Sequence, residues 1–186
     1  MVAATPPACD FGWKAADFAL PATDGSIVTL DAALGRNGLL IMFICNHCPY
    51  VVSVLDRLIA DARAVQALEI GVVAICANDA DNYPADSFDN MVTFAKRGGF
   101  TFPYLHDENQ SVARAYGAAC TPDFFGFNHE LELQYRGRLD DAGRGAADRS
   151  TKRELYDAMR RIAETGTGPT AQIPSMGCSI KWKSAA

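Results

Sequence analysis

The clearest hydrophobic pattern in the chain is an apolar run that turns into a helical repeat. Residues 39–44 (LLIMFI) have no polar position on either face, which is typical of a central strand covered on both sides. From Val51 to Val65 apolar residues recur at steps of three and four, with Asp and Arg between them. This predicts an amphipathic helix that begins near Pro49, where the missing amide hydrogen of proline has no partner to lose.

The other apolar segments predict an α/β succession of strands and helices. We expect a hairpin of strands at 18–20 and 26–30, further strands at 71–77, 100–105, 124–127 and 131–135, and helices at 87–97, 109–116 and 151–164. Thr151 and Glu154 have the spacing of a capping box at the start of the last helix. The polar stretch 78–86 lacks the spacing of a calcium loop, so we expect a solvated turn there.

The two ends of the chain have different compositions. Residues 1–11 predict an irregular leader, whereas the tail 167–186 contains IPSMGCSIKW, an apolar sequence around Cys178. An apolar tail is expected to pack back on the protein, and it would carry its cysteine with it. With 186 residues we expect one domain, spanning 1–186 and able to bury about 70% of its unfolded surface.

Composition and charge exclude several function classes. The chain is 49% apolar and 21% charged, with a net charge of −5, so nothing predicts a nucleic-acid or membrane partner. The N-terminal segment has neither the basic start nor the apolar core of a signal peptide, which favours a cytoplasmic location. Six cysteines are too few for a secreted disulfide framework, and in a reducing compartment they are expected to be thiols.

Candidate chemistry lies where the central strand meets its helix, at Cys45, Asn46, His47, Cys48 and Pro49. A thiol at a helix start faces unpaired backbone N–H groups and the positive end of the dipole, and both favour the thiolate. We therefore interpret Cys48 as the reactive residue, with His47 able to exchange protons with a sulfur. The alternatives are a buried pair of cysteines that pack as small hydrophobes and a structural metal site.

Six sequence blocks resemble one known group of proteins. They are FICNHCPYV, YPAD, FPYLHDENQ, ACTPDFFGF, YRGRLDD and GCSIKW, and together they are similar to the peroxiredoxin-like, AhpC/TSA family, related to the TlpA/ResA branch. The resemblance runs from about Gly12 to Glu164 and into the tail. It implies a thioredoxin fold: a central mixed β-sheet flanked by helices, with an N-terminal β-hairpin and a C-terminal tail packed on the domain.

The same resemblance implies roles for particular residues. Cys48 matches the nucleophile that opens the usual C-x-x-C motif, and Val51 stands where its partner cysteine would be. Thr121-Pro122 matches the cis-proline turn that faces the nucleophile. We expect substrate to contact Thr121, Pro122, Asn46 and Pro49, and no metal ligand or cofactor is expected.

Three thiols are candidates to resolve an oxidised Cys48. Cys45 and Cys178 rank equally, and Cys120 comes third. The favoured function is thiol-disulfide oxidoreductase, and the alternative is a thiol peroxidase with an antioxidant role. The peroxidase is less favoured because Cys45 replaces the threonine expected three residues before the nucleophile, and because the spacing of Arg136 and Arg138 places neither at the site.

These functions imply particular partners. The substrate would be a disulfide-containing protein or a small-molecule thiol or peroxide, and a thioredoxin or glutathione system would supply electrons. Two non-enzymatic alternatives remain. Cys45, His47, Cys48 and Cys178 could bind zinc or copper(I), or the groove beside Pro122 could bind peptides without turnover.

Overall fold

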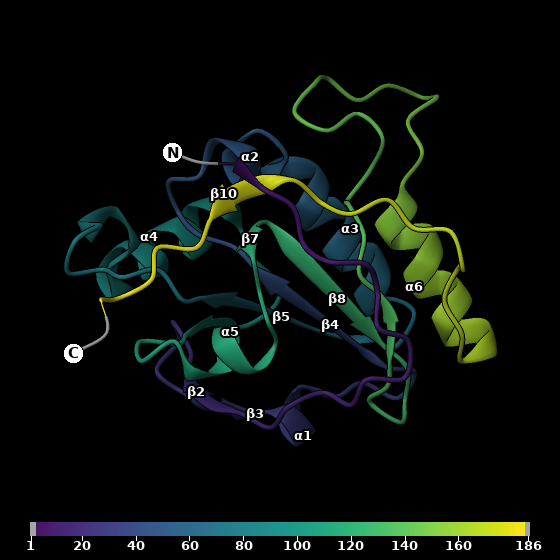
Figure 1. Ribbon diagram of the computed structural model, residues 1–186, viewed down its shortest axis with the longest axis horizontal. Helices are drawn as coiled ribbons and strands as arrows, with labels where there is room; N and C mark the ends of the chain where they lie inside the picture. The colour runs from purple at the N-terminus through teal and green to yellow at the C-terminus, as the bar shows by residue number, and fades with distance from the viewer. Residues whose placement is uncertain (1–2, 185–186) are drawn as a thin grey trace.

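The computed structural model describes residues 3–184, and a five-stranded mixed sheet forms its centre (Figure 1). The strands, in spatial order, are β6 (Tyr104–His106), β5 (Gly71–Cys76), β4 (Leu39–Phe43), β8 (Asp123–Phe127) and β9 (Leu133–Tyr135). β4, β5 and β6 are parallel, whereas β8 is antiparallel to β4 and β9 to β8. Ile41 lies opposite Val73 on one side and Phe125 on the other. The apolar run 39–44 is therefore the central strand, as predicted.

Helices cover one face of the sheet, and a mixed layer covers the other (Figure 1). The helices are α1 (Leu30–Ala33), α2 (Pro49–Val52), α3 (Leu55–Gln66), α4 (Phe88–Gly98), α5 (Ser111–Ala115) and α6 (Glu154–Thr165), with a 3-10 turn, η1 (Pro84–Asp86). Leu40 and Met42 of β4 pack toward α3, α4 and α6. Leu39 and Ile41 pack toward α1, α5 and the hairpin, because alternate residues of a strand face opposite sides.

The predicted N-terminal hairpin is present. β2 (Ala19–Pro21) pairs antiparallel with β3 (Ile27–Thr29). Gly25 in the connecting turn has φ of 88°, a conformation that glycine adopts without a steric penalty. An isolated bridge from Ala22 to Leu105 joins this hairpin to the edge strand β6.

Both ends of the chain meet in a second, three-stranded sheet. The tail forms β10 (Gly177–Ser179), which lies between β1 (Ala3–Ala4) and β7 (Cys120–Thr121), antiparallel to both. Figure 1 shows the N-terminal strand beside the yellow tail. The packed tail is thus confirmed, whereas Ala3–Ala4 is a short strand within the leader expected to be irregular. Residues 1–2 and 185–186 of that leader and tail lie outside the described residues.

Two helix predictions need correction. The helix expected from Pro49 is divided, because Val54 leaves helical backbone angles (φ −113°, ψ 2°) while its side chain stays in the core. The last helix begins at Glu154 after Arg153, without a side-chain cap, so the capping-box prediction is wrong. The hydroxyl of Thr151 instead accepts the backbone N–H of Asp148 in the preceding loop.

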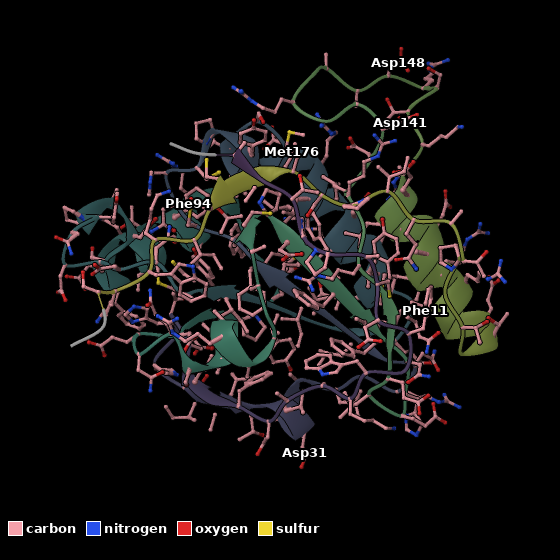
Figure 2. All side chains as sticks on the ribbon, in the orientation of Figure 1. Phe11, Asp31, Phe94, Asp141, Asp148 and Met176 are labelled. Carbon is pink, nitrogen blue, oxygen red and sulfur yellow. The ribbon has the colours of Figure 1, made fainter. Side chains whose placement is uncertain are left out.

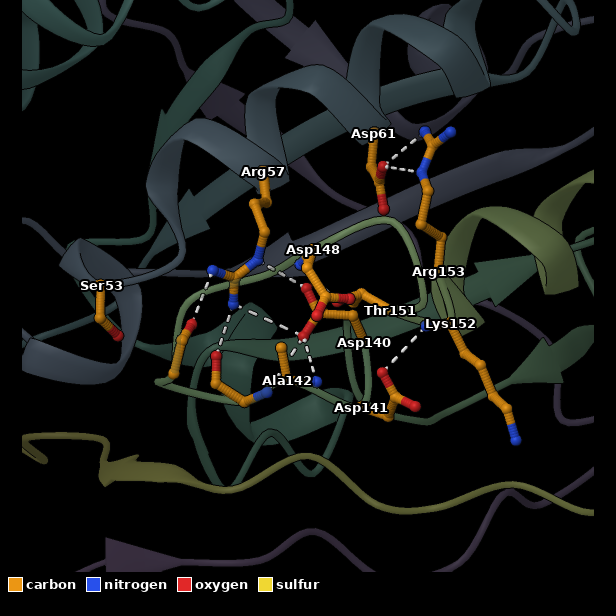
Figure 3. Close-up of polar contacts among 12 residues, drawn as sticks. Ser53, Arg57, Asp61, Asp140, Asp141, Ala142, Asp148, Thr151, Lys152 and Arg153 are labelled. Atoms are coloured by element: carbon orange, nitrogen blue, oxygen red, sulfur yellow. Dashed lines mark hydrogen bonds and ion pairs between the residues drawn. The ribbon is translucent and has the colours of Figure 1, made fainter.

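The loop before α6 is fastened to α3 by ion pairs (Figure 3). The guanidinium of Arg57 bonds to Asp140 and to loop carbonyl oxygens, and Arg153 pairs with Asp61.

Across residues 3–184 no helix is long and apolar enough to span a membrane.

Candidate active site

Cys48 is held at the junction between β4 and α2, on the residue that precedes the first turn of α2. Its side chain is fully buried, and in the thiol form it donates to the carbonyl oxygen of Thr121 at 3.1 Å. The peptide bond between Thr121 and Pro122 is cis, as the resemblance implied. The nucleophile and the proline turn expected from the sequence therefore meet in the structure.

Two further thiols surround Cys48. The sulfur of Cys45 lies 3.3 Å from the hydroxyl of Thr121 and forms a hydrogen bond with Cys48. Cys178 lies opposite Thr121 in the register of β10 and β7, and both its side chain and its backbone N–H hydrogen bond to the Cys48 sulfur. Cys45, Cys48 and Cys178 thus form one group, which we call the thiol triad.

The triad favours a thiolate at Cys48. Hydrogen bonds from Cys45, then from Cys178 and Thr121, lower the pKa of Cys48 to about 4, although burial acts in the opposite direction. The hydrogen bond to Cys48, together with burial, raises the pKa of Cys45 far above its usual range. Burial followed by the interaction with Cys48 raises the pKa of Cys178 to about 11. At neutral pH, Cys48 is then the thiolate, and its neighbours are protonated donors.

The cause of this low pKa differs from the predicted one. From the sequence, the low pKa of Cys48 was expected to result from its place at the start of a long helix. In the structure α2 has only 4 residues, and the Cys48 side chain makes no capping hydrogen bond to this helix. The donors come instead from nearby Cys45, from Cys178 in β10, far along the chain, and from Thr121. The long-range pairing of the tail with β7 therefore supplies hydrogen bonds that stabilise the Cys48 thiolate, a stabilisation that was expected from the helix start.

Cys120, the third candidate resolving thiol, bonds elsewhere. Its sulfur donates to the carbonyl oxygen of Pro122 at 3.4 Å and lies 3.9 Å from the hydroxyl of Ser175. Burial, followed by the charge of Asp123, raises its pKa to about 12. Within the described part of the chain no hydrogen bond joins Cys120 to Cys48, so the structure places it beside the triad rather than in it.

A buried carboxylate organises the turn that carries Asn46 and His47. Asp86 is fully buried, and its oxygens accept the backbone N–H of Asn46 at 2.8 Å and the side-chain amide of Asn78 at 2.7 Å. The Nδ1 atom of His47 lies 2.8 Å from Oδ2 of Asp86. The stretch 78–86 was expected to be a solvated turn, and for the buried Asp86 this prediction is wrong. Asp86 was not among the residues predicted to lie at the site. Its only signal was its place in the YPAD block.

The residues expected to contact substrate lie on two sides of the triad. Pro122 lines a largely apolar cavity of about 430 Å³, together with Tyr50 and Met176. Pro49 is partly buried at the start of α2 and precedes Tyr50 in the chain. Asn46 lines a different cavity, and its side chain is engaged by Ala85 and Tyr104. Contact between substrate and these residues stays a prediction.

The two candidate arginines are committed to ion pairs. Arg136 lies 2.9 Å from Asp123, and Arg138 lies 2.6 Å from Glu154. The guanidinium of Arg136 also stands over the ring of Phe125, 4.4 Å from its centre. Neither arginine forms a hydrogen bond with Cys48 among residues 3–184.

The fold and the site define a thioredoxin-like redox protein. The chain is similar to an uncharacterised conserved protein from Geobacillus kaustophilus, with 42% identity, a TM-score of 0.93, and coverage of 100% of this chain and 99% of the other. A hypothetical protein from Sinorhizobium meliloti gives 39% identity and a TM-score of 0.91, with 97% and 99% covered. Peroxidoxin BcpB from Mycobacterium tuberculosis shares the fold, with 17% identity, a TM-score of 0.56, and 84% and 93% covered.

A family model gives the more particular assignment. The model of the AhpC/TSA family matches residues 11–137, and the chain belongs to that family. A search of the curated proteins found no match. Family and fold together support a thiol-based redox function of the thiol-disulfide oxidoreductase or peroxidase type.

Proposed function

We propose that the protein is a thiol-disulfide oxidoreductase in which Cys48 is the nucleophile and Cys178 is the resolving thiol. One observation carries the proposal. The pairing of β10 with β7 holds Cys178 against the Cys48 sulfur, beside the turn at Pro122. The low pKa of Cys48 supplies a nucleophile at neutral pH, because the thiolate is the attacking species.

The proposed reaction has two exchange steps. The Cys48 thiolate attacks one sulfur of a substrate disulfide, whose other sulfur leaves as a thiolate and takes up a proton. Cys178 then loses its proton and attacks the Cys48 sulfur of the mixed disulfide, which releases the second substrate thiol and leaves a Cys48-Cys178 disulfide. A dithiol or glutathione reductant returns the pair to thiols. The need for that reductant is our reason to propose a reducing, cytoplasmic location.

Cys178 is preferred to Cys45 because it ionises more readily. Besides the Cys48 interaction and burial, the charge of Asp86 raises the pKa of Cys45, whereas Lys181 acts in the lowering direction on Cys178. A resolving thiol must become a thiolate before it attacks. The larger thiolate fraction of Cys178 favours it for this step.

A thiol peroxidase is the second candidate, favoured by membership of the AhpC/TSA family. In that reaction Cys48 attacks the O–O bond, which gives Cys48 sulfenic acid and an alcohol or water. Cys178 then condenses with the sulfenic acid to form the same disulfide, and water leaves. The two candidates share their final product and differ in the oxidant.

Disulfide mapping by mass spectrometry tests the proposal. The reduced, metal-free protein is treated with a substoichiometric disulfide or with hydrogen peroxide, and the rates and products are compared. We expect a Cys48-Cys178 disulfide that forms faster with the disulfide. A faster reaction with peroxide would favour the peroxidase, and an unmodified Cys48 would overturn both.

Single-cysteine variants assign the roles. Cys178→Ser should accumulate a mixed disulfide on Cys48, whereas Cys45→Ser should still form the Cys48-Cys178 bond. Cys9→Ser serves as a control, because Cys9 packs against the opposite face of the sheet from the triad. If Cys45→Ser accumulated the mixed disulfide instead, Cys45 would be the resolving thiol. A Cys48→Ser variant that kept every activity would indicate a peptide-binding module.

A further inference from the structure

The triad thiol Cys45 also lies close to an imidazole and a carboxylate, His47 and Asp86, to which the proposed exchange reaction gives no role. The ligand atoms of Cys45, His47 and Asp86 all lie within 4.8 Å of one another. Cys45 and Asp86 are buried, and His47 is partly exposed. Metal ions in proteins are bound by this set of donor types.

His47 and Asp86 form a close contact that counts as an ion pair when the imidazole is protonated but does not have the geometry of a hydrogen bond. Nδ1 of His47 and Oδ2 of Asp86 are 2.8 Å apart, yet the buried Nδ1 has no hydrogen-bond partner among the described residues. If Nδ1 carries no proton, two lone pairs face each other at that distance. A cation bonded to both atoms would remove the repulsion, so the buried Nδ1 without a hydrogen bond is compatible with a metal ligand pair.

Outer contacts hold the donors in place, as they do around known metal sites. The side-chain amide of Asn78 donates to Asp86, and the oxygen of that amide accepts the backbone N–H of Lys181 in the tail. The ring of His47 is stacked with Tyr83, with ring centres 6.2 Å apart and planes 3° from parallel. The side chain of His47 therefore has a fixed direction toward Asp86.

We propose that Cys45, His47 and Asp86 bind one zinc ion, with the fourth coordination position open. Cys45 binds as the thiolate, so its proton is released when zinc binds and its hydrogen bond to Cys48 is lost in the zinc-bound form. Zinc accepts thiolate, imidazole and carboxylate together, whereas copper(I) prefers soft donors and magnesium prefers oxygen donors. A cavity of about 240 Å³ lined by Asn46 and His47 gives an entry path. The site goes beyond the redox function, and it differs from the ligand set suggested by the sequence: Cys48 and Cys178 are left out, and Asp86 is added.

Zinc binding to the reduced full-length chain tests the site. We expect about one zinc per chain by calorimetry and by metal analysis after desalting, and cobalt(II) as a substitute should show a thiolate-to-metal charge-transfer band. His47→Phe and Asp86→Asn should each weaken zinc binding at least about tenfold. Cys48→Ser and Cys178→Ser should keep it. The Phe variant retains the stack on Tyr83, so its loss of zinc would not reflect a missing aromatic ring.

Control variants distinguish zinc bound by Cys45, His47 and Asp86 from zinc bound elsewhere on the chain. Asp81→Asn changes an exposed carboxylate in the same loop and should bind zinc as the parent does. Thermal unfolding of metal-free variants shows whether they are folded. Absence of zinc binding in the parent, or binding that survives Asp86→Asn and His47→Phe but is lost in Cys178→Ser, would overturn the proposal. Disulfide mapping is done on metal-free protein. The test of the redox proposal therefore does not depend on whether the chain binds zinc.

Discussion

Cys178 lies directly opposite Thr121 in the antiparallel pairing of β10 with β7, and this pairing closes the tail over Cys48. Cys48, the proposed nucleophile, is fully buried, although the proposed reaction requires it to meet molecules from outside the protein. Met176, which precedes β10, projects toward solvent (Figure 2), whereas Ile180, which follows β10, is buried in the core. Reaction therefore depends on how tightly the tail is docked.

Loosening the tail should expose Cys48. Ile180→Ala removes a buried anchor, a change that costs about 2–5 kcal/mol of docking or stability. We expect alkylation of Cys48 to become at least about tenfold faster, because about 1.4 kcal/mol already changes an opening equilibrium tenfold. The measurement is the rate of modification of Cys48 by mass spectrometry. Met176→Ala, at a residue that is 58% exposed, is the matched control and should leave the rate unchanged.

The pH profile of alkylation reports the ionisation of Cys48. With its pKa lowered to about 4 by hydrogen bonds from Cys45, Cys178 and Thr121, the rate should stay level through neutral pH and fall only near pH 4. A hydrogen bond to a charged group contributes about 1.5–3 kcal/mol. Cys45→Ala should therefore raise the midpoint and slow the reaction about two- to fifteenfold at pH 5. The rate on the plateau at high pH reports how accessible Cys48 is to the reagent, whereas the midpoint reports its pKa. The two effects can therefore be measured separately.

Cys45→Ser provides the comparison for that experiment. Its hydroxyl keeps a donor in the same position, so the midpoint should move less than in Cys45→Ala. If the midpoint stayed near 4 in both variants, the hydrogen bond from Cys45 would not be the main cause of the low pKa of Cys48.

The elements of the fold were predictable where local pattern decides them. The run 39–44 is apolar on both faces, and the turn at Gly25 requires a residue tolerant of positive φ, so the central strand and the hairpin were expected correctly. The ends of α2 and α6 were not, because buried Val54 and the contacts of Thr151 in the preceding loop determine them. These are tertiary contacts that no short window of sequence contains.

The same distinction applies to the site. Cys48 was predicted from its position between strand and helix, and Cys178 from an apolar tail that was expected to pack; the structure places their sulfurs together, and their roles stay predictions. Asp86 was missed because acidic and amide side chains between elements normally remain in water. Its burial depends on Asn46, 40 positions away, whose backbone N–H it accepts. The cause of the low Cys48 pKa was also missed, since it comes from a strand pairing rather than from the helix.

The buried ion pair between Asp123 and Arg136 should be essential for stability. Both residues are buried, and burial raises the pKa of Asp123 while Arg136 lowers it. Arg136→Leu leaves the carboxylate without its partner and should reduce the free energy of unfolding by about 3–5 kcal/mol at pH 7. The pKa of Asp123 then rises further, so protonation at lower pH should recover part of the loss. Urea unfolding at pH 7 and pH 5 measures both effects.

An exposed pair gives the control for Arg136. Arg160 and Asp157 are 3.5 Å apart on the surface of α6, and Arg160→Leu should change stability by no more than about 0.5 kcal/mol. Adding Asp123→Asn to Arg136→Leu should restore part of the stability, because the uncompensated charge is removed. A double variant no more stable than the single one would mean that the other contacts of Arg136, with Gly117 and Phe125, matter more.

Arg57 should control the motion of the loop between β9 and α6. Figure 3 shows its guanidinium bonded to Asp140 and to the carbonyl oxygens of Gly143 and Gly145, with Nε 2.7 Å from the carboxylate. This loop forms one wall of the cavity beside Pro122, so its order affects how substrate would enter. Arg57→Ala removes a hydrogen-bonded ion pair worth about 1.5–3 kcal/mol. We expect amide hydrogen exchange in residues 140–150 to become at least about tenfold faster, with the exchange of β4 unchanged.

Arg63→Ala is the control: it removes a hydrogen bond from α3 to the carbonyl oxygen of Gly99 and should leave exchange in the loop unaffected. Equal acceleration in both variants would show that destabilisation of α3, rather than release of the loop, causes the faster exchange.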